Sequence, residues 1–274
     1  MLYIRNCIIA YIKHLIRMCK FYNQPLDMVD SAVRRLKHKN RRWRMLRAAA
    51  PVIDKSKTII VFSGGGYMSC FLFGVARYIK EHYQGSSENL YFAGVSAGAL
   101  AATGLALDCD IQSLFEETLK CYPRFPTMKD IRGSAESINP GDVTWRKATN
   151  RLYIGATRFP TMAPENIHTF ESQEDGTRAL EATCQFPLLI GMLPIKIAGK
   201  YYYDGAMFND YPSIPEGMED YRRIYVNWVN SADIYPGIDI PMLWMLCPPS
   251  VEGMWQLENL GYLRAKEYFR KMCV

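Results

Sequence analysis

Two long uncharged stretches, each interrupted by small residues, constrain the fold of this chain more than any other feature. Residues 58–76 and 89–107 each contain 19 consecutive uncharged residues, which is enough length to cross a membrane. Three successive glycines, Gly64 to Gly66, would break a helix in the first stretch, and the second stretch is largely alanine and glycine. A buried strand, a tight turn and a helix therefore describe each stretch better than a membrane span.

The second stretch contains a pattern that places a serine on a tight turn between a strand and a helix. Gly94-Val95-Ser96-Ala97-Gly98 fits G-x-S-x-G, in which glycines permit a strained backbone and a close approach of the helix. Such a turn lifts the Ser96 hydroxyl above the sheet, at the positive end of the helix. Ser96 is therefore a candidate nucleophile; the alternative is a small-residue turn that only packs a helix on a strand.

A serine nucleophile needs a base, and the sequence offers two alternatives. His168 is the only histidine after Ser96, and a triad would pair it with a carboxylate such as Asp142. In the usual order for this turn the histidine comes last, and His168 lies early for that role. The other alternative is Asp204, which follows the aromatic run 201–203 at a turn that projects its carboxylate from a strand end. From there a carboxylate can accept the serine proton without an imidazole.

The order of these motifs resembles the patatin-like phospholipase family. The loop Gly64-Gly65-Gly66 follows the first predicted strand, and GVSAG begins 28 residues after it. The segment ALEATCQFPLLIGMLPIKIAGKYYYDGA is similar to the segment that leads to the catalytic aspartate in that family. Pro187 occupies the position of a proline that recurs there. The resemblance covers roughly residues 58–212.

This resemblance implies an α/β fold, a three-layer α/β/α domain with a mostly parallel central sheet. It also implies hydrolysis of a lipid acyl ester, by a phospholipase A, a lysophospholipase or an acylglycerol lipase, without a metal or organic cofactor. Ser96 matches the nucleophile and Asp204 the base of a Ser-Asp dyad. The glycines of the serine turn correspond to Gly94 and Gly98, and the oxyanion hole to Gly64, Gly65, Gly66 and Ala97.

Two departures from the family pattern bear on activity. The family often continues its glycine loop with a basic residue and another glycine, whereas this chain has residues 67–69, Tyr-Met-Ser. Asp210 stands two residues before Pro212, where the family tends to have asparagine. A second carboxylate near Asp204 is expected to raise the pKa of the base. Both departures motivate an alternative function, a catalytically silent lipid-binding or scaffold protein.

Charge is distributed unevenly along the chain. Residues 1–57 contain 14 Lys and Arg against three acidic residues, whereas the remaining residues contain 19 against 24. Residues 2–22 have the period of an amphipathic helix, and their charges favour a helix lying in the membrane interface over a spanning one. The alternative is a helix docked on the core of the protein itself. This basic leader predicts a polyanionic partner.

A polybasic run follows this helix. Residues 34–47 contain eight Lys and Arg, enough to bind an anionic leaflet. Nucleic acid is not the expected partner, because Trp43 alone provides too little aromatic surface for base stacking. A solvated helix face is a further alternative. We therefore predict three parts: an amphipathic helix at 1–22, a polybasic helical segment at 23–57 and an acyl hydrolase domain at 58–274.

The cysteines and the rest of the sequence complete the expectations. The eight cysteines form no C-x-x-C pair and no metal-ligand spacing, so we expect free thiols in a reducing compartment. The predicted protein is cytoplasmic, is attached peripherally to a membrane through its leader, and acts on phospholipid or acylglycerol. Helices are predicted at 111–121, 176–185 and 250–271, with Asp110 as the N-cap of the first, and Asp142 is predicted to cap a further short helix. Strands are predicted at 151–157, 223–229 and 240–246. Residues 122–141 are predicted to form a surface loop or lid.

Overall fold

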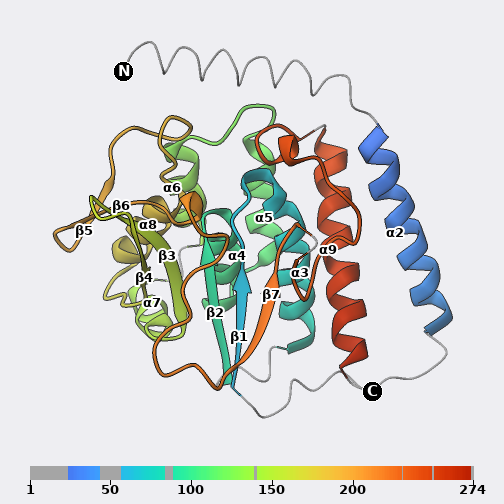
Figure 1. Cartoon of the computed structure of the whole chain (residues 1–274), viewed down its shortest axis with the longest axis horizontal. Helices are drawn as coiled ribbons and strands as arrows, with labels where there is room; N and C mark the ends of the chain where they lie inside the picture. Colours follow the sequence, from blue (N-terminus) through green and yellow to red (C-terminus); the bar gives the residue numbers. More distant parts are fainter. Residues whose placement is uncertain are drawn as a thin grey trace.

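A seven-stranded, mostly parallel sheet organises the part of the chain that the structure describes (Figure 1). The structure is a computed structural model, and the residues it describes are 24–43, 57–83, 89–138, 141–229, 231–248 and 250–272. The predicted amphipathic helix at 2–22 lies outside these residues, as does the end of the polybasic run.

The strands alternate with helices through the first half of the domain, as the two strand-turn-helix motifs predict. Four strands are parallel and adjacent in the order β3, β2, β1 and β7. Strands β4 and β6 each pair antiparallel with β3, and β5 pairs antiparallel with β6. The strands are β1 (Thr58–Phe62), β2 (Leu90–Val95), β3 (Leu152–Phe159), β4 (Ala163–Ile167), β5 (Ile195–Ile197), β6 (Lys200–Asp204) and β7 (Arg222–Val226).

The helices begin at residues that the sequence marks as caps. Asp110 accepts a hydrogen bond from the Gln112 amide and begins α5, as predicted, and Ser172 and Asp175 form a capping box at the start of α8. The described helices are α2 (Gln24–Trp43), α3 (Ser69–Tyr83), α4 (Ala97–Ala106), α5 (Ile111–Lys120), α6 (Met128–Ser137), α7 (Asp142–Ala148), α8 (Gln173–Cys184) and α9 (Val251–Lys271), with short 3-10 turns η1 (Gly66–Met68), η3 (Gly205–Met207) and η4 (Met242–Met245).

Each face of the sheet has its own apolar cluster. Ile60 and Phe62 belong to the main core, which includes residues of α3, α4 and α9. Ile59 and Val61 point to the other face and pack in a smaller cluster that includes Met218, from the segment before β7. Alternation along β1 thus buries both faces, which is why this strand is a continuous apolar run. This mixed α/β architecture confirms the predicted fold class.

The pairing of β3 brings two strand ends together. Strand β3 pairs with β4 over residues 154–158, and this range overlaps the parts of β3 that pair with β2 and with β6. Because a strand has only two edges, β2 and β6 share the edge opposite β4. Strand β2 therefore ends with Val95 beside Gly155, and β6 ends with Asp204 beside Ala156, the next residue of β3.

Helix α2 contains the first part of the predicted polybasic segment, and it is docked on the domain beside α9 (Figure 1). Val29, Val33 and Leu36 are buried on one side of this helix, while Arg34 and Arg35 are exposed. The charges of Arg34, Arg35 and Lys37 therefore lie on the solvated face of a packed helix, in agreement with that alternative for this part of the run. None of the helices in the described ranges combines the length and hydropathy needed to cross a membrane.

Three predictions of secondary structure were wrong. Residues 240–246 form no strand, because Pro241 begins the 3-10 turn η4. The segment predicted as a surface loop or lid, 122–141, is not all loop, because it contains helix α6, which begins with a capping box between Thr127 and Asp130. Gly141, and not Asp142, is the N-cap of α7, and Asp142 is its first residue.

The close packing of α3 on α9 depends on glycine. A methyl group on Gly74 would lie 1.8 Å from the carbonyl oxygen of Glu258, and one on Gly261 would lie 2.0 Å from that of Phe71. Both contacts are with backbone, which cannot move aside as a flexible side chain can. The two helices approach as closely as they do only because neither position has a side chain.

We predict that Gly74→Ala destabilises the protein by about 2–3 kcal/mol, because the added methyl group forces the helices apart. Gly133→Ala in α6 is the matched control, since nothing lies within 4 Å of the added methyl group; it should leave stability unchanged or raise it by about 1 kcal/mol. Denaturant unfolding curves measure both changes. Equal stability of the two variants would contradict this description of the α3–α9 contact.

Candidate active site

Ser96 occupies the turn between β2 and α4 in a backbone conformation that is rare for serine. Its φ is 51° and its ψ is −133°, and it is the N-cap of α4. A non-glycine residue at positive φ is strained and persists only where its surroundings hold it. Here the Ser96 N–H donates to Thr183 Oγ1 at 2.8 Å, and the Thr183 hydroxyl donates to the Gly155 carbonyl at 2.6 Å. Thr183, in α8, thereby links the turn at Ser96 to strand β3.

The two glycines of this turn are required by close packing. A side chain on Gly98 would meet the Ser63 carbonyl oxygen at 2.1 Å, and one on Gly94 would meet the Gly98 carbonyl oxygen at 2.6 Å. Helix α4 can therefore start directly against β1 and β2. Its positive N-terminal end points at the space above Ser96.

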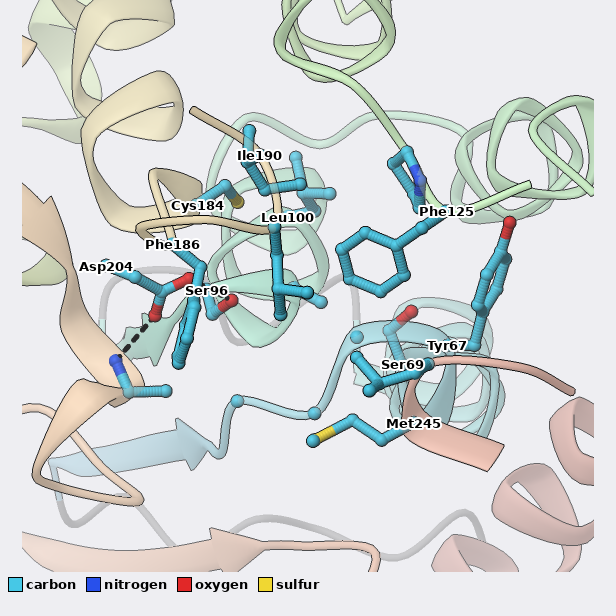
Figure 2. A pocket seen from close by; sticks show the side chains of 18 of the residues that line it. Tyr67, Ser69, Ser96, Leu100, Phe125, Cys184, Phe186, Ile190, Asp204 and Met245 are labelled. Carbon is cyan, nitrogen blue, oxygen red and sulfur yellow. Dashed lines mark hydrogen bonds between the residues drawn. The ribbon is translucent and has the colours of Figure 1, made fainter. Parts of the chain in front are cut away.

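Asp204 lies directly against Ser96, as expected from the meeting of β6 and β2. Figure 2 shows the Ser96 and Asp204 side chains close together. The Ser96 hydroxyl donates to Asp204 Oδ2 at 2.8 Å, and the Ala206 N–H donates to Oδ1 at 2.7 Å. Asp204 is only 2% exposed. Burial raises its pKa to about 7, and the hydrogen bonds from Ala206 and Ser96 offset part of this rise. Asp204 therefore has the protonation behaviour of a base suited to neutral pH.

Asp210 is not the cause of this raised pKa, contrary to the expectation from the sequence. The contributions to the pKa of Asp204 are its burial and the bonds to Ala206 and Ser96, and none comes from Asp210. The Asp210 side chain is exposed, so solvent screens its charge. Its carbonyl oxygen has a different role, because it accepts a hydrogen bond from the Gly64 N–H at 3.3 Å.

The predicted oxyanion residues lie together at the cavity, but they are not equivalent. Gly64, Gly65, Gly66 and Ala97 all line it. The Gly64 N–H is already bonded to Asp210, and the Gly64 carbonyl accepts from Trp228 Nε1 at 3.0 Å. No acceptor among the described residues takes the N–H groups of Gly65, Gly66 or Ala97. These three donors, and not Gly64, are the ones available to a negatively charged oxygen.

The dyad opens into an apolar cavity of about 510 Å³. Figure 2 shows Leu100, Ile190 and Phe186 around the serine, with Tyr67 and Phe125 further along. Tyr67 begins the sequence that departs from the family pattern after the glycine loop. Its ring packs edge-on against Phe125 with 6.1 Å between centroids. An apolar wall therefore stands where a basic residue is common in the family.

His168 lies elsewhere. Its Nδ1 is 2.9 Å from Asn150 Oδ1, near the start of β3, and its ring lies beside Tyr153. Asp142, the carboxylate considered for a triad, accepts a hydrogen bond from the Gln173 N–H. Neither residue lines the cavity. The arrangement does not assemble the Ser-His-Asp alternative.

Two contributors to the site were missed by sequence reasoning. Thr183 holds the backbone of Ser96, and Trp228 holds the glycine loop through its ring N–H. Thr183 lies within the segment resembling the approach to the aspartate, but nothing in its surroundings marks it as a partner of Ser96. Trp228 follows β7 in a part of the chain that the resemblance does not cover.

Comparison with known proteins leads to the same family as the motif order. The bovine (Bos taurus) patatin-like phospholipase domain-containing protein 2 is 30% identical over 166 residues, or 56% of this chain and 34% of that protein. The human (Homo sapiens) patatin-like phospholipase domain-containing protein 4 is 27% identical over 57% of this chain and 67% of that protein. The homologues of this chain are patatin-like phospholipase domain-containing proteins. The resemblance inferred from the motifs is thereby confirmed.

The comparisons also match a further curated protein and a solved structure. Human omega-hydroxyceramide transacylase is 28% identical over 53% of this chain and 30% of that protein. The matched region spans about a third of the length of the bovine relative. The crystal structure of VipD from Legionella pneumophila aligns with a TM-score of 0.46 and 12% identity, covering 79% of this chain and 67% of that one. A scan of protein-family profiles finds no match.

We predict that Asp204→Asn stabilises the protein at alkaline pH. The folded-state pKa of about 7 exceeds the ordinary value of 3.8. Folding therefore favours the protonated carboxyl, and stability is lost as pH rises from about 3.8, the ordinary pKa, to about 7. Asparagine has no charge to bury, so the gain in Tm over wild type should be several degrees at pH 8 and smaller at pH 5.

Thermal unfolding at the two pH values measures this effect. Asp210→Asn is the control, because its exposed side chain is hydrated in both the folded and the unfolded protein. A gain for Asp204→Asn that did not grow with pH would show that burial does not raise the pKa of Asp204.

Proposed function

We propose that this protein is a lipid acyl-ester hydrolase in which Ser96 is the nucleophile and Asp204 the base. The observation that carries the proposal is the 2.8 Å contact between the Ser96 hydroxyl and a buried carboxylate whose pKa is about 7. The patatin-like phospholipase homologues support acyl hydrolysis in general. The contact supplies the two groups that such a reaction needs.

In the first half of the reaction, Ser96 Oγ attacks the ester carbonyl and its proton passes to Asp204 Oδ2. The oxygen of the tetrahedral intermediate becomes negative. The donors for it are the N–H groups of Gly65 and Gly66, in the glycine loop, and of Ala97, the first residue of α4. Removing one donor of this kind typically costs roughly 3–4 kcal/mol of transition-state stabilisation.

In the second half, Asp204 returns the proton to the leaving alkoxide, and the acyl group remains on Ser96. Water then attacks the acyl-enzyme while Asp204 accepts a proton from it, and Asp204 passes that proton to Ser96 Oγ as the fatty acid is released. A single carboxylate therefore acts in turn as base and acid in each half of the reaction. A pKa of about 7 serves both roles, because neither protonation state is strongly disfavoured at neutral pH.

The cavity favours a substrate with a long apolar group, a phospholipid or an acylglycerol. Its volume of about 510 Å³ falls within the usual range of ligand pockets. The side chains beyond the dyad are mainly apolar, so an acyl chain bound there would leave few polar groups without partners. The names of the relatives, patatin-like phospholipase domain-containing proteins, agree with this substrate class.

We predict that Ser96→Ala and Asp204→Asn each reduce turnover of a soluble monomeric ester by at least about 10³-fold, because each removes one member of the dyad. His168→Ala should retain turnover within about twofold of wild type, since His168 contacts Asn150 and not the cavity. Initial rates with a chromogenic short-chain ester measure all three. If only the histidine variant lost activity, the reaction would use a triad with His168 and not the dyad. An inactive folded wild type would favour the silent lipid-binding alternative.

Peripheral membrane association through the basic leader belongs to the same proposal. The 14 Lys and Arg in residues 1–57 would attract an anionic lipid surface.

In the full chain, substituting Lys13, Arg17 and Lys20 by Glu should weaken binding to anionic vesicles and leave soluble-ester turnover intact. Salt should have the same effect on wild type, because it screens exposed charges. Binding unchanged by both would show that the leader does not attach the protein.

A further inference from the structure

The turn between α8 and β5, residues 186–193, contributes to the cavity wall. Phe186, Leu189 and Ile190 line the cavity around the dyad, and Figure 2 shows Phe186 and Ile190 close to Ser96. We call residues 186–193 the rim turn. Its sequence, FPLLIGML, contains no charged or hydrogen-bonding side chain.

The same turn also carries exposed apolar side chains that lie outside the cavity lining. Leu188 is 39% exposed, Met192 52% and Leu193 78%, and none of them lines the cavity. An apolar surface therefore runs from the inner wall of the cavity to the outside of the protein without a polar interruption along this turn. Large exposed apolar side chains grouped in this way are typical of an interaction surface.

Hydrogen bonds hold the rim turn in this conformation. The Tyr203 hydroxyl donates to the Met192 carbonyl at 3.0 Å, and Gln185 Nε2 donates to the Leu193 carbonyl at 2.6 Å. Leu188 has a φ of 71°, in the left-handed region where glycine or asparagine would be less strained. A leucine that is both strained and exposed gives the folded protein no evident advantage in stability, which points to a role in binding.

Two other segments extend this apolar surface at the cavity. Phe208 is 62% exposed and follows Met207, which lines the cavity. Met242, in η4, lines the cavity and is itself 69% exposed. Exposed apolar side chains thus come from three separate parts of the chain beside one cavity.

We propose that the rim turn, with Phe208 and Met242, is the surface that docks this protein onto a phospholipid layer. The inference rests on the proposed function, since it places the cavity against the substrate. Leu188, Met192 and Leu193 would enter the acyl-chain region, so that an acyl chain passes from the layer to Ser96 along apolar surface. A lipid layer suits this surface better than a protein partner, because a protein bound here would obstruct the cavity that has to admit the substrate.

The test measures binding in the absence of turnover. Full-length Ser96→Ala protein is sedimented with phosphatidylcholine vesicles at high salt, where the basic leader contributes little. Adding Leu188→Asn and Leu193→Asn should weaken binding by about tenfold or more, because two apolar side chains no longer leave water. Asparagine tolerates positive φ, so the fold should be retained. Leu193→Asn alone, which involves no strained position, should give a smaller loss in the same direction.

Val143→Asn is the matched control. Val143 is 62% exposed on α7, and this helix contributes no residue to the lining of the cavity. Binding of this variant should stay within about twofold of the parent. Equal losses in the control and the rim variants, or no loss in the rim variants, would overturn the proposal.

Further readouts separate this proposal from its alternatives. In the active chain, the rim variants should keep soluble-ester turnover and lose vesicle hydrolysis in proportion to binding. If the wild type proves inactive on both substrates, the hydrolase assignment fails while the sedimentation result still decides the docking surface. Sedimentation velocity without lipid tests a second copy as the occupant. Conversion of a dimer to a monomer by the rim variants, without a change in vesicle binding, would assign the surface to self-association.

Discussion

The site depends on one feature of the sheet, the meeting of two strand ends against consecutive residues of β3. Strand β2 ends beside Gly155 and β6 ends beside Ala156, and this brings Ser96 and Asp204 together although they are 108 residues apart. The contact leaves no room for side chains: a methyl group on Gly205 would lie 2.2 Å from the Gly155 carbonyl oxygen. Register and glycine content along this edge therefore determine whether the dyad forms.

Burial at this meeting point gives Asp204 its chemical character. A carboxylate in water is too weak a base to accept a serine proton readily, whereas a desolvated one binds a proton more tightly. The two bonds from Ala206 and Ser96 keep Asp204 oriented, and its pKa nevertheless remains near 7. The conformation of Ser96, with φ at 51°, similarly opposes folding while it positions the hydroxyl. Both unfavourable features lie where the proposed reaction takes place.

The sequence predicts the local parts of this arrangement well and the long-range parts poorly. Glycine turns, strands β1 and β2 and the cap at Asp110 follow from residues close together in the chain, and the motif order indicates the family. The hydrogen bond from the Ser96 N–H to Thr183, and the one from the Trp228 ring N–H to the Gly64 carbonyl, join distant segments that share no pattern. The Gly64 N–H donates to a backbone carbonyl, and no side chain in the sequence indicates this hydrogen bond. The apolar run at 240–246, predicted as a strand, is instead a 3-10 turn beside the cavity, because Pro241 begins that turn.

The pH dependence of covalent labelling at Ser96 tests the central claim most directly, because a fluorophosphonate reports nucleophile activation without requiring the natural lipid. Labelling rates are measured from pH 5 to 9 by mass spectrometry, and the modified peptide is sequenced. We predict an adduct on Ser96 whose formation rate rises as pH passes through about 7, with the rise absent in Asp204→Asn and retained in His168→Ala. An adduct on another residue, or the same pH profile in Asp204→Asn as in wild type, would contradict it.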